Sequence, residues 1–312
     1  MGTVLVTHDL SEAARRPLAD AGHQVMVRPA LSAAALSALA PDVDGIVAVL
    51  TDRIDAALLR GGAAGRLRVV ANVAVGYDNI DVGAAWRSGV AVCNTPGVLD
   101  ESTADLAMLL MLAACRQSPA AEEELRAGRF EGWSISGYLG RDVHGAVLGL
   151  VGYGRIARAL ARRAAGFGMQ ILHHARHDTG VAGFVPDLDA LLRRSDIVSV
   201  HVPLTAKTQG LIGPEQLAVM KPTAVLINTA RGPVLDEGAV AAALVAGRLF
   251  AAGFDVYDGE PVINPALLAA PRTVLLPHIG SATVETRTQM SQLACQGVCD
   301  VLAGVTPPNL VV

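Results

Sequence analysis

The sequence predicts an α/β protein with two doubly wound domains, each built on a parallel β-sheet. Short apolar segments alternate with Ala-rich segments of helical period along the chain, and a glycine-rich turn at 152–157 joins one such strand to a helix. No repeat, low-complexity run or long polar linker separates the two halves. Strands that alternate with helices form parallel sheets through crossover connections. Both domains are therefore expected to be Rossmann-like, with an active-site cleft between them.

The N-terminal part of the chain supplies one complete set of strands and helices. Helical segments such as 32–39 and 55–60 lie between its apolar strand candidates. The strand candidates are residues 3–7, 24–28, 45–50, 69–73 and 91–94. Because helical segments separate these strands, this part of the chain is expected to form a parallel sheet before the glycine-rich turn begins.

A long helix and a second set of strands follow. The segment 101–115 is apolar over most of its length, which predicts a helix buried on most sides. The next strand candidates are residues 147–151, 169–172, 197–201, 224–228, 251–255 and 273–276. Six strands separated by helices or short turns are typical of a doubly wound nucleotide-binding domain. From residue 284 onward the pattern is helical again.

Composition restricts the class of protein. A chain of 312 residues is expected to hold two domains. With 52% hydrophobic residues and a net charge of −4, it can bury a large core and has no basic excess for nucleic acid. No signal peptide is expected, and no apolar run reaches the ~20 residues that span a bilayer. Four cysteines without a CxxC pair favour free thiols in a reducing cytoplasm.

The glycine-rich turn predicts a dinucleotide site. The strand candidate 147–151 leads into GYGRIA at 152–157, and a helical pattern and a second strand follow. This is the context in which a GxGxxG/A motif is informative. Gly152 permits the tight turn, Gly154 lets the backbone approach a pyrophosphate, and Ala157 keeps the helix close to the strand. The first N–H groups of the helix and its dipole then favour the phosphates.

The end of the following strand indicates which dinucleotide binds. In NAD-binding proteins this strand normally ends in Asp or Glu, which binds the ribose hydroxyls. Here it ends in HHARH at 173–177, with Arg176 and no acid. An arginine suits a 2′-phosphate, so NADP is expected, with NAD as a weaker alternative. Because adjacent strand residues face opposite ways, His173 and His174 are not expected to share a metal ion, and no metal is predicted.

Polar residues with complementary chemistry follow three of the later strands. Ligands of open α/β sheets bind beyond the carboxyl ends of the strands, and Arg231, Glu260 and His278 follow successive strand candidates. Arg231 can hold a carboxylate through two parallel hydrogen bonds and polarise a carbonyl. His278 can exchange a proton with the substrate oxygen, and Glu260 can orient it and favour its protonated form. Backbone N–H groups near Val75 and Gly76 can share the carboxylate. The set fits reduction of a 2-keto acid.

Seven segments, in order, resemble those of the D-isomer-specific 2-hydroxyacid dehydrogenase family. They are VAVGYDNID (73–81), STADLA (102–107), GLVGYGRIA (149–157), HVPLTAKTQGLI (201–212), INTARGPVLDE (227–237), FDVYDGEP (254–261) and LPHIGSAT (276–283). The match covers nearly the whole chain. Within the family these segments are closest to glyoxylate/hydroxypyruvate reductases, as is LTDRID at 50–55.

The resemblance implies a role for each candidate residue. Arg231, Glu260 and His278 would form the catalytic set, with His278 as the proton donor. The substrate would be bound by Val75, Gly76, Arg231, His278 and Ser281. The cofactor would be bound by Thr103, Gly152, Gly154, Arg155, Ile156, Arg176, Pro203, Thr208, Thr229, Asp255 and Gly280. Members that use NAD carry an acid where this chain has Ala175, which supports NADPH.

The resemblance also implies how the chain is divided and assembled. A flavodoxin-like substrate-binding domain would comprise residues 1–97 plus 284–312, and a Rossmann domain would comprise residues 98–283. A homodimer would form around the helix at 101–115. Whether a neighbouring subunit contributes to the pocket, for example through Trp133, stays open.

The sequence therefore predicts a cytoplasmic, NADPH-preferring reductase of small 2-keto acids. The expected reactions are glyoxylate to glycolate and hydroxypyruvate to D-glycerate. An alternative enzyme would act on bulkier 2-keto acids such as phenylpyruvate. A hypothesis from another class is a dinucleotide-sensing corepressor, although the disordered tails usual in such proteins are absent here. The physiological substrate, the strength of the NADPH preference and the direction of the reaction stay open.

Overall fold

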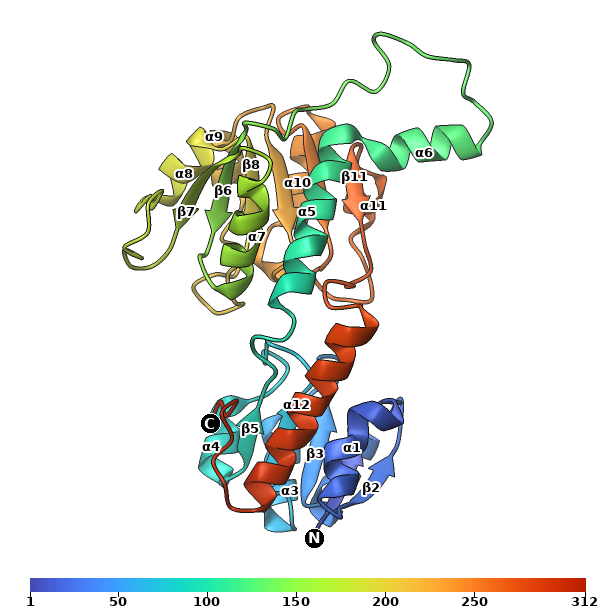
Figure 1. Ribbon diagram of the computed structural model, residues 1–312, viewed down its shortest axis with the longest axis vertical. Coiled ribbons are helices and arrows are strands. Elements are labelled where there is room, and N and C mark those ends of the chain that lie inside the picture. The colour runs from blue at the N-terminus through green and yellow to red at the C-terminus, as the bar shows by residue number, and fades with distance from the viewer. The chain divides into compact units, whose positions relative to one another are not determined.

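The computed structural model describes all residues from 1 to 312, and the chain forms two compact units. The first unit consists of Met1–Leu99 and Ser281–Val312, and the second consists of Asp100–Gly280. Each unit contains one sheet whose strands are all parallel to their neighbours, with helices between the strands (Figure 1). The predicted fold class, α/β with two doubly wound parallel sheets, is confirmed.

The sheet of the first unit has five strands in the order β2-β1-β3-β4-β5. The strands are β1 (Thr3–Val6), β2 (Gln24–Val27), β3 (Gly45–Ala48), β4 (Val69–Asn72) and β5 (Ala91–Cys93). The helices are α1 (Glu12–Asp20), α2 (Ala33–Leu39), α3 (Ala56–Ala64), α4 (Val82–Ser88) and α12 (Val284–Leu302). Leu5 belongs to a core with α2, α3 and α4, whereas Val4 and Val6 belong to a core with α1 and α12. Neighbouring residues of β1 thus face opposite sides of the sheet.

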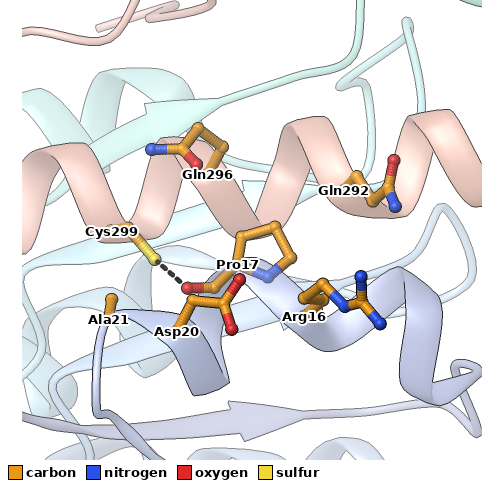
Figure 2. Close-up of a pocket in the computed structure, with 7 residues that line it drawn as sticks. All are labelled: Arg16, Pro17, Asp20, Ala21, Gln292, Gln296 and Cys299. Carbon is orange, nitrogen blue, oxygen red and sulfur yellow. Dashed lines mark hydrogen bonds between the residues drawn. The ribbon is translucent and has the colours of Figure 1, made fainter.

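Helices α1 and α12 meet through polar contacts at a proline. Pro17 lies inside α1 and has no N–H, so the carbonyl of Ala13 loses its helical donor. Nε2 of Gln292 in α12 donates to that carbonyl at 3.0 Å, and the Cys299 thiol donates to the Pro17 carbonyl at 3.4 Å. A pocket of about 320 Å³ lies at these helices, and Figure 2 shows the residues of α1 and α12 that line it. These contacts fix the C-terminal helix to the N-terminal part of the same unit.

The sheet of the second unit has six strands in the order β11-β10-β9-β8-β6-β7. The strands are β6 (Val147–Val151), β7 (Gln170–His174), β8 (Ile197–Val200), β9 (Val225–Asn228), β10 (Ala251–Phe254) and β11 (Thr273–Leu275). The helices are α5 (Asp100–Arg116), α6 (Ser118–Arg126), α7 (Arg155–Ala165), α8 (Leu188–Arg194), α9 (Pro214–Val219), α10 (Glu237–Val245) and α11 (Pro265–Ala269). No helix of the protein combines the length and apolar character needed to cross a membrane.

The order of these strands indicates where a ligand is expected to bind. Strand β6 lies between β7 and β8, so the chain moves outward from β6 in both directions. Ligands of open α/β sheets bind at such a switch point, beyond the carboxyl ends of the strands. In the second unit this point is the glycine-rich turn that follows β6.

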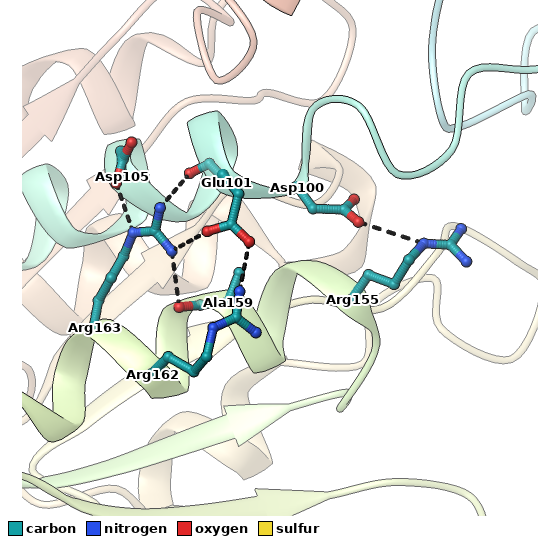
Figure 3. A network of polar contacts seen from close by, with 7 residues as sticks. All are labelled: Asp100, Glu101, Asp105, Arg155, Ala159, Arg162 and Arg163. Carbon is teal, nitrogen blue, oxygen red and sulfur yellow. Dashed lines mark hydrogen bonds and ion pairs between the residues drawn. The ribbon is translucent and has the colours of Figure 1, made fainter.

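Helices α5 and α7 are joined by ion pairs, as Figure 3 shows. Near the end of α7, Arg163 lies 2.6 Å from Asp105 and 2.7 Å from Glu101. At the start of α7, Arg155 lies 3.5 Å from Asp100. The acids stand near the N-terminus of α5, where the helix dipole favours negative charge. The pairs thus hold both ends of α7, the helix that begins at the glycine-rich turn.

Candidate active site

The turn after β6 has the shape that a dinucleotide site requires. Gly152 has a φ of +92°, and an added Cβ would lie 2.5 Å from the carbonyl oxygen of His201, so only glycine fits. A Cβ on Gly154 would meet no atom within 4 Å, so the turn is open there. Arg155 and Ile156 form the first turn of α7, which has no side-chain cap at its N-cap residue. The first N–H groups of α7 are therefore available to an anion.

Two rings fix the turn against β7. The ring of Tyr153 stacks on that of His173 with centroids 3.8 Å apart, and His173 Nε2 lies 2.7 Å from Thr179 Oγ1. Burial lowers the pKa of His173. His174 bonds instead through Nδ1 to the carbonyl of Val185 at 3.1 Å. The two histidines have separate partners, and no group of three or more His, Cys, Asp or Glu side chains could hold a metal ion.

The residues after β7 present one arginine to solvent. Ala175 is half-buried, whereas Arg176 is exposed and makes no hydrogen bond or ion pair within the chain. The next acid in the sequence, Asp178, accepts a hydrogen bond from the N–H of Gly180 at 2.9 Å, within its own turn. The guanidinium of Arg176 can therefore bind a phosphate without losing a partner in the protein.

Other cofactor candidates lie after β8 and β9. Thr208 Oγ1 donates to the carbonyl of Pro203 at 2.6 Å in the loop after β8. Thr229 follows β9 directly, and its hydroxyl is buried without a hydrogen-bond partner. A buried polar atom without a partner is rare in folded proteins. The Thr229 hydroxyl, the open turn at Gly154 and the free N–H groups of α7 together fit a bound dinucleotide.

Asp255 holds the backbone that follows the candidate proton donor. Its two carboxylate oxygens accept hydrogen bonds from the N–H groups of Ile279 at 2.7 Å and Gly280 at 2.8 Å. Burial raises the pKa of Asp255, although these two bonds oppose the shift. A Cβ on Gly280 would lie 3.4 Å from the methyl group of Thr103. His278 has a φ of +55°, a costly conformation for a non-glycine residue, and Asp255 stabilises the residues beside it.

His278 and Glu260 form a hydrogen-bonded pair. His278 Nδ1 lies 2.8 Å from Glu260 Oε2, and Glu260 Oε1 accepts from the N–H of Tyr257 at 2.8 Å. Burial tends to raise the pKa of Glu260, but the bonds from His278 and Tyr257 and the charge of Arg231 outweigh it and hold this pKa below its usual value. Glu260 is thus ionised at neutral pH. The Nε2 atom of His278 remains for proton exchange with a ligand.

Arg231 reaches the same edge of the sheet as this pair. Its carbonyl accepts from Asn228 Nδ2 at 2.9 Å, and its Nη1 donates to the carbonyl of Ala230 at 2.8 Å. Strands β9, β10 and β11 are neighbours in the sheet. Because parallel strands end at a common edge, Arg231, Glu260 and His278 follow one another across it. A guanidinium group, which can bind a carboxylate, thus shares this edge with the hydrogen-bonded pair of His278 and Glu260.

The loop between β10 and α11, which contains Glu260 and is called the Glu260 loop below, is supported by residues that the sequence prediction did not name as site residues. Glu237 Oε1 accepts from the N–H of Asp258 at 2.7 Å, and the Tyr257 hydroxyl donates to the Leu276 carbonyl at 2.9 Å. Burial raises the pKa of Glu237 against that hydrogen bond. Gly232 packs on the loop so closely that a Cβ would lie 1.8 Å from the Tyr257 carbonyl carbon. The one signal in the sequence is that Gly232 and Glu237 both fall within INTARGPVLDE.

The remaining substrate-site candidates lie in the first unit. Val75 and Gly76 follow β4 and are half-buried, and their N–H groups donate to no group of the chain. Ser281 is also half-buried and precedes α12, where its carbonyl accepts from the N–H of Thr283 at 2.9 Å. The first unit thus offers two unpaired backbone donors beyond a strand end.

Sequence comparison finds one matching family profile. The profile described as "D-isomer specific 2-hydroxyacid dehydrogenase, NAD binding domain" matches residues 108–280. A glyoxylate reductase of Korarchaeum cryptofilum is 47% identical over 279 residues, which cover 86% of this chain and 83% of that protein.

Solved structures agree with this match. A protein of Thermus thermophilus superposes with a TM-score of 0.93 and 41% identity, covering 99% of this chain and 100% of the other. The NADPH-dependent glyoxylate/hydroxypyruvate reductase of Sinorhizobium meliloti, solved with NADP and malonate, superposes with a TM-score of 0.89 and 35% identity. That match covers 99% of this chain and 96% of the other.

Proposed function

Because the chain belongs to the family of D-isomer-specific 2-hydroxyacid dehydrogenases, we propose that it reduces glyoxylate to glycolate and hydroxypyruvate to D-glycerate, with NADPH as the preferred reductant. The observation that carries this proposal is the bond of 2.8 Å between His278 and the ionised Glu260 at the sheet edge that also bears Arg231. The glyoxylate reductase of Korarchaeum cryptofilum supports the choice of small 2-keto acids.

Each residue of the catalytic set has one task. NADPH, when bound, supplies the hydride. His278 donates a proton from Nε2 to the substrate oxygen, because its Nδ1 is engaged by Glu260. Ionised Glu260 stabilises the protonated imidazole. Arg231 binds the substrate carboxylate through two parallel charge-assisted hydrogen bonds and polarises the adjacent carbonyl.

The other candidate residues bind the two ligands. In the first unit, the backbone N–H groups of Val75 and Gly76, with Ser281, would share the carboxylate. The pyrophosphate of the cofactor would lie on the glycine-rich turn at 152–157 and the N-terminus of α7. Its remaining contacts would come from Thr103, Pro203, Thr208, Thr229, Asp255 and Gly280.

The preference for NADPH rests on the residues that follow β7. Arg176 is exposed and has no partner in the chain, so it can pair with a 2′-phosphate. Ala175 supplies no carboxylate for the ribose hydroxyls that NAD would present. The Sinorhizobium meliloti relative, which is NADPH-dependent, supports the same preference. NADH is expected to serve with lower efficiency.

We also propose that the protein forms a homodimer and that it works in the cytoplasm. No helix or strand forms between residues 127 and 146, and this segment exposes Phe130, Trp133, Ile135 and Leu139. A group of exposed large apolar residues is typical of a surface that a second protein covers. All four cysteines are buried free thiols, which suits a reducing compartment. Sedimentation at several concentrations tests the dimer, and a monomer throughout would refute it.

The catalytic assignment is tested by two substitutions. We expect His278→Ala to abolish the oxidation of NADPH by glyoxylate while NADPH binding, measured by fluorescence titration, stays nearly unchanged. We expect Arg231→Ala to raise the KM for glyoxylate about ten- to a hundredfold, the value of a lost hydrogen bond to a charged group. Loss of NADPH affinity in the first variant would contradict the role of His278 as proton donor, and an unchanged KM in the second would contradict carboxylate binding by Arg231.

A further inference from the structure

The loop after β4 has three consecutive carbonyl groups that are all held by hydrogen bonds. The acceptors are the carbonyl oxygens of Ala74, Val75 and Gly76. Their donors are the Thr95 N–H at 2.9 Å, Asn94 Nδ2 at 2.8 Å and Asn72 Nδ2 at 2.8 Å, respectively. Two of the three donors are therefore side-chain amides, at the ends of β4 and β5.

These bonds determine where the N–H groups of the loop point. In a trans peptide the N–H points opposite to the C=O of the same unit, and the one cis bond of the chain is at Glu260–Pro261. The N–H groups of Val75, Gly76 and Tyr77 therefore point away from their carbonyls' donors. None of these N–H groups donates to another group of the chain. Successive free N–H groups of this kind form an anion-binding concavity.

Both amide side chains are themselves held in place. Asn72 is fully buried, and its Nδ2 also donates to Asn79 Oδ1 at 3.0 Å. Asn79 Nδ2 in turn donates to the Asp52 carbonyl at 2.9 Å. The backbone carbonyl of Asn94 accepts from Asn309 Nδ2 at 2.7 Å. Both asparagines thus have hydrogen-bond partners outside residues 74–76.

We propose that Asn94 and Asn72 are positioning residues for the substrate: by holding the carbonyls of Val75 and Gly76, they orient the N–H group of Gly76, which would bind the carboxylate of a 2-keto acid, and the neighbouring N–H group of Tyr77. This inference rests on the proposed function. Without the amides, the peptide units could rotate and turn carbonyl oxygens toward the carboxylate, which like charge disfavours. Neither asparagine touches the substrate in this mechanism.

The test is Asn94→Ala with Gln292→Ala as the matched control. Both substitutions remove a half-buried amide of the first unit that donates to a backbone carbonyl, but Gln292 holds the carbonyl of Ala13 and none of residues 74–76. We expect Asn94→Ala to raise the KM for glyoxylate roughly tenfold, with kcat changed less than about twofold. The inhibition constant of oxamate, a carboxylate of similar shape that accepts no hydride, should rise in parallel. The KM for NADPH should stay unchanged, and Gln292→Ala should leave all these constants close to the wild type.

Two outcomes would overturn the proposal. One is an unchanged KM and oxamate constant in folded Asn94→Ala, and the other is an equal loss in Gln292→Ala. If Asn94→Ala does not fold, Asn94→Leu serves, because it keeps the approximate size of the side chain and removes the N–H donor without adding a charge. If the wild type reduces no 2-keto acid, the proposed function fails. Calorimetric titration of the wild type and of Asn94→Ala with oxamate then tests the positioning role of Asn94 separately. Binding by wild type that Asn94→Ala weakens supports the positioning role, and no binding by wild type refutes it.

Discussion

Replacing Glu260 by glutamine removes one charge and leaves the shape of the site. In the native protein Glu260 accepts twice, from His278 Nδ1 and from the N–H of Tyr257, each at 2.8 Å. A glutamine has a single oxygen, and the Tyr257 N–H can only donate, so that oxygen is committed to Tyr257. The glutamine NH₂ group then faces His278 Nδ1. The glutamine NH₂ group and the Nδ1–H group of a protonated His278 are both donors and cannot bond to each other. The protonated imidazole of His278 therefore loses the partner that stabilises it.

The expected loss of activity can be estimated from how exposed the side chains of His278 and Glu260 are. A hydrogen bond to a charged group contributes about 1.5–3 kcal/mol. The side chains of His278 and Glu260 are 27% and 30% exposed, so solvent screens part of their attraction and the lower end of that range applies. Glu260→Gln should therefore lower kcat/KM for glyoxylate reduction about tenfold at neutral pH.

The assay is the measurement of kcat/KM for glyoxylate with NADPH at neutral pH. The value should fall about tenfold in Glu260→Gln, which corresponds to about 1.4 kcal/mol. Asp258→Asn is the control, because Asp258 is an exposed carboxylate close in sequence with no side-chain bond to His278. An unchanged kcat/KM in Glu260→Gln, or an equal loss in Asp258→Asn, would refute the reasoning.

Three further predictions test the cofactor site and the fold. Arg176→Ala should raise the KM for NADPH about ten- to a hundredfold and leave that for NADH nearly unchanged; an equal loss for both would exclude a 2′-phosphate contact. Gly152→Ala should lower the melting temperature, because Gly152 has a φ of +92° and a Cβ there would meet a backbone carbonyl. Gly154→Ala should leave the melting temperature unchanged and weaken NADPH binding. An equal change in melting temperature for both variants would contradict these two assignments. Burial lowers the pKa of His201 from 6.5 to about 4, so His201 takes up a proton in the unfolded chain before it does so in the folded protein. The free energy of unfolding should therefore fall by up to about 1.4 kcal/mol per pH unit as the pH drops from 6.5 to about 4. Denaturant unfolding of His201→Gln should show a weaker dependence on pH, and a slope identical to that of the wild type would contradict this role of His201.

Much of the candidate site could be predicted because parallel strands end at one edge. Arg231, Glu260 and His278 each follow a strand whose apolar run is visible in the sequence, and the structure places these strands side by side. The glycine-rich turn could be predicted for a similar reason. Gly152 occupies a left-handed conformation next to the His201 carbonyl, a place that no other residue could fill.

Hydrogen bonds between loops that are distant in the chain could not be predicted from the sequence. Glu237 supports the Glu260 loop from more than twenty positions away, and Asn94 holds the carbonyl of Val75 across two strand ends. The left-handed backbone of His278 likewise depends on its neighbours' bonds to Asp255. Side-chain bonds to a distant backbone follow no period of two or 3.6 residues, so periodicity cannot reveal them.

The second unit also contains an element that the prediction omitted. Helix α6 (Ser118–Arg126) has no buried residue, so it lacks the apolar stripe by which a helix is detected in sequence. The helix at 101–115, in contrast, was visible because its apolar residues are buried against the sheet, and the structure extends it to Asp100–Arg116. Burial thus decided which helices could be predicted.

The central claim, an NADPH-preferring reductase of small 2-keto acids, is tested most directly by one steady-state measurement. The wild-type protein is assayed with a panel of 2-keto acids, including glyoxylate, hydroxypyruvate and phenylpyruvate, with NADPH and NADH in parallel. We predict the highest kcat/KM for glyoxylate and hydroxypyruvate, and a higher value with NADPH than with NADH for each. Failure of every 2-keto acid to oxidise either cofactor would contradict the assignment as an enzyme, and a preference for NADH would contradict the role of Arg176.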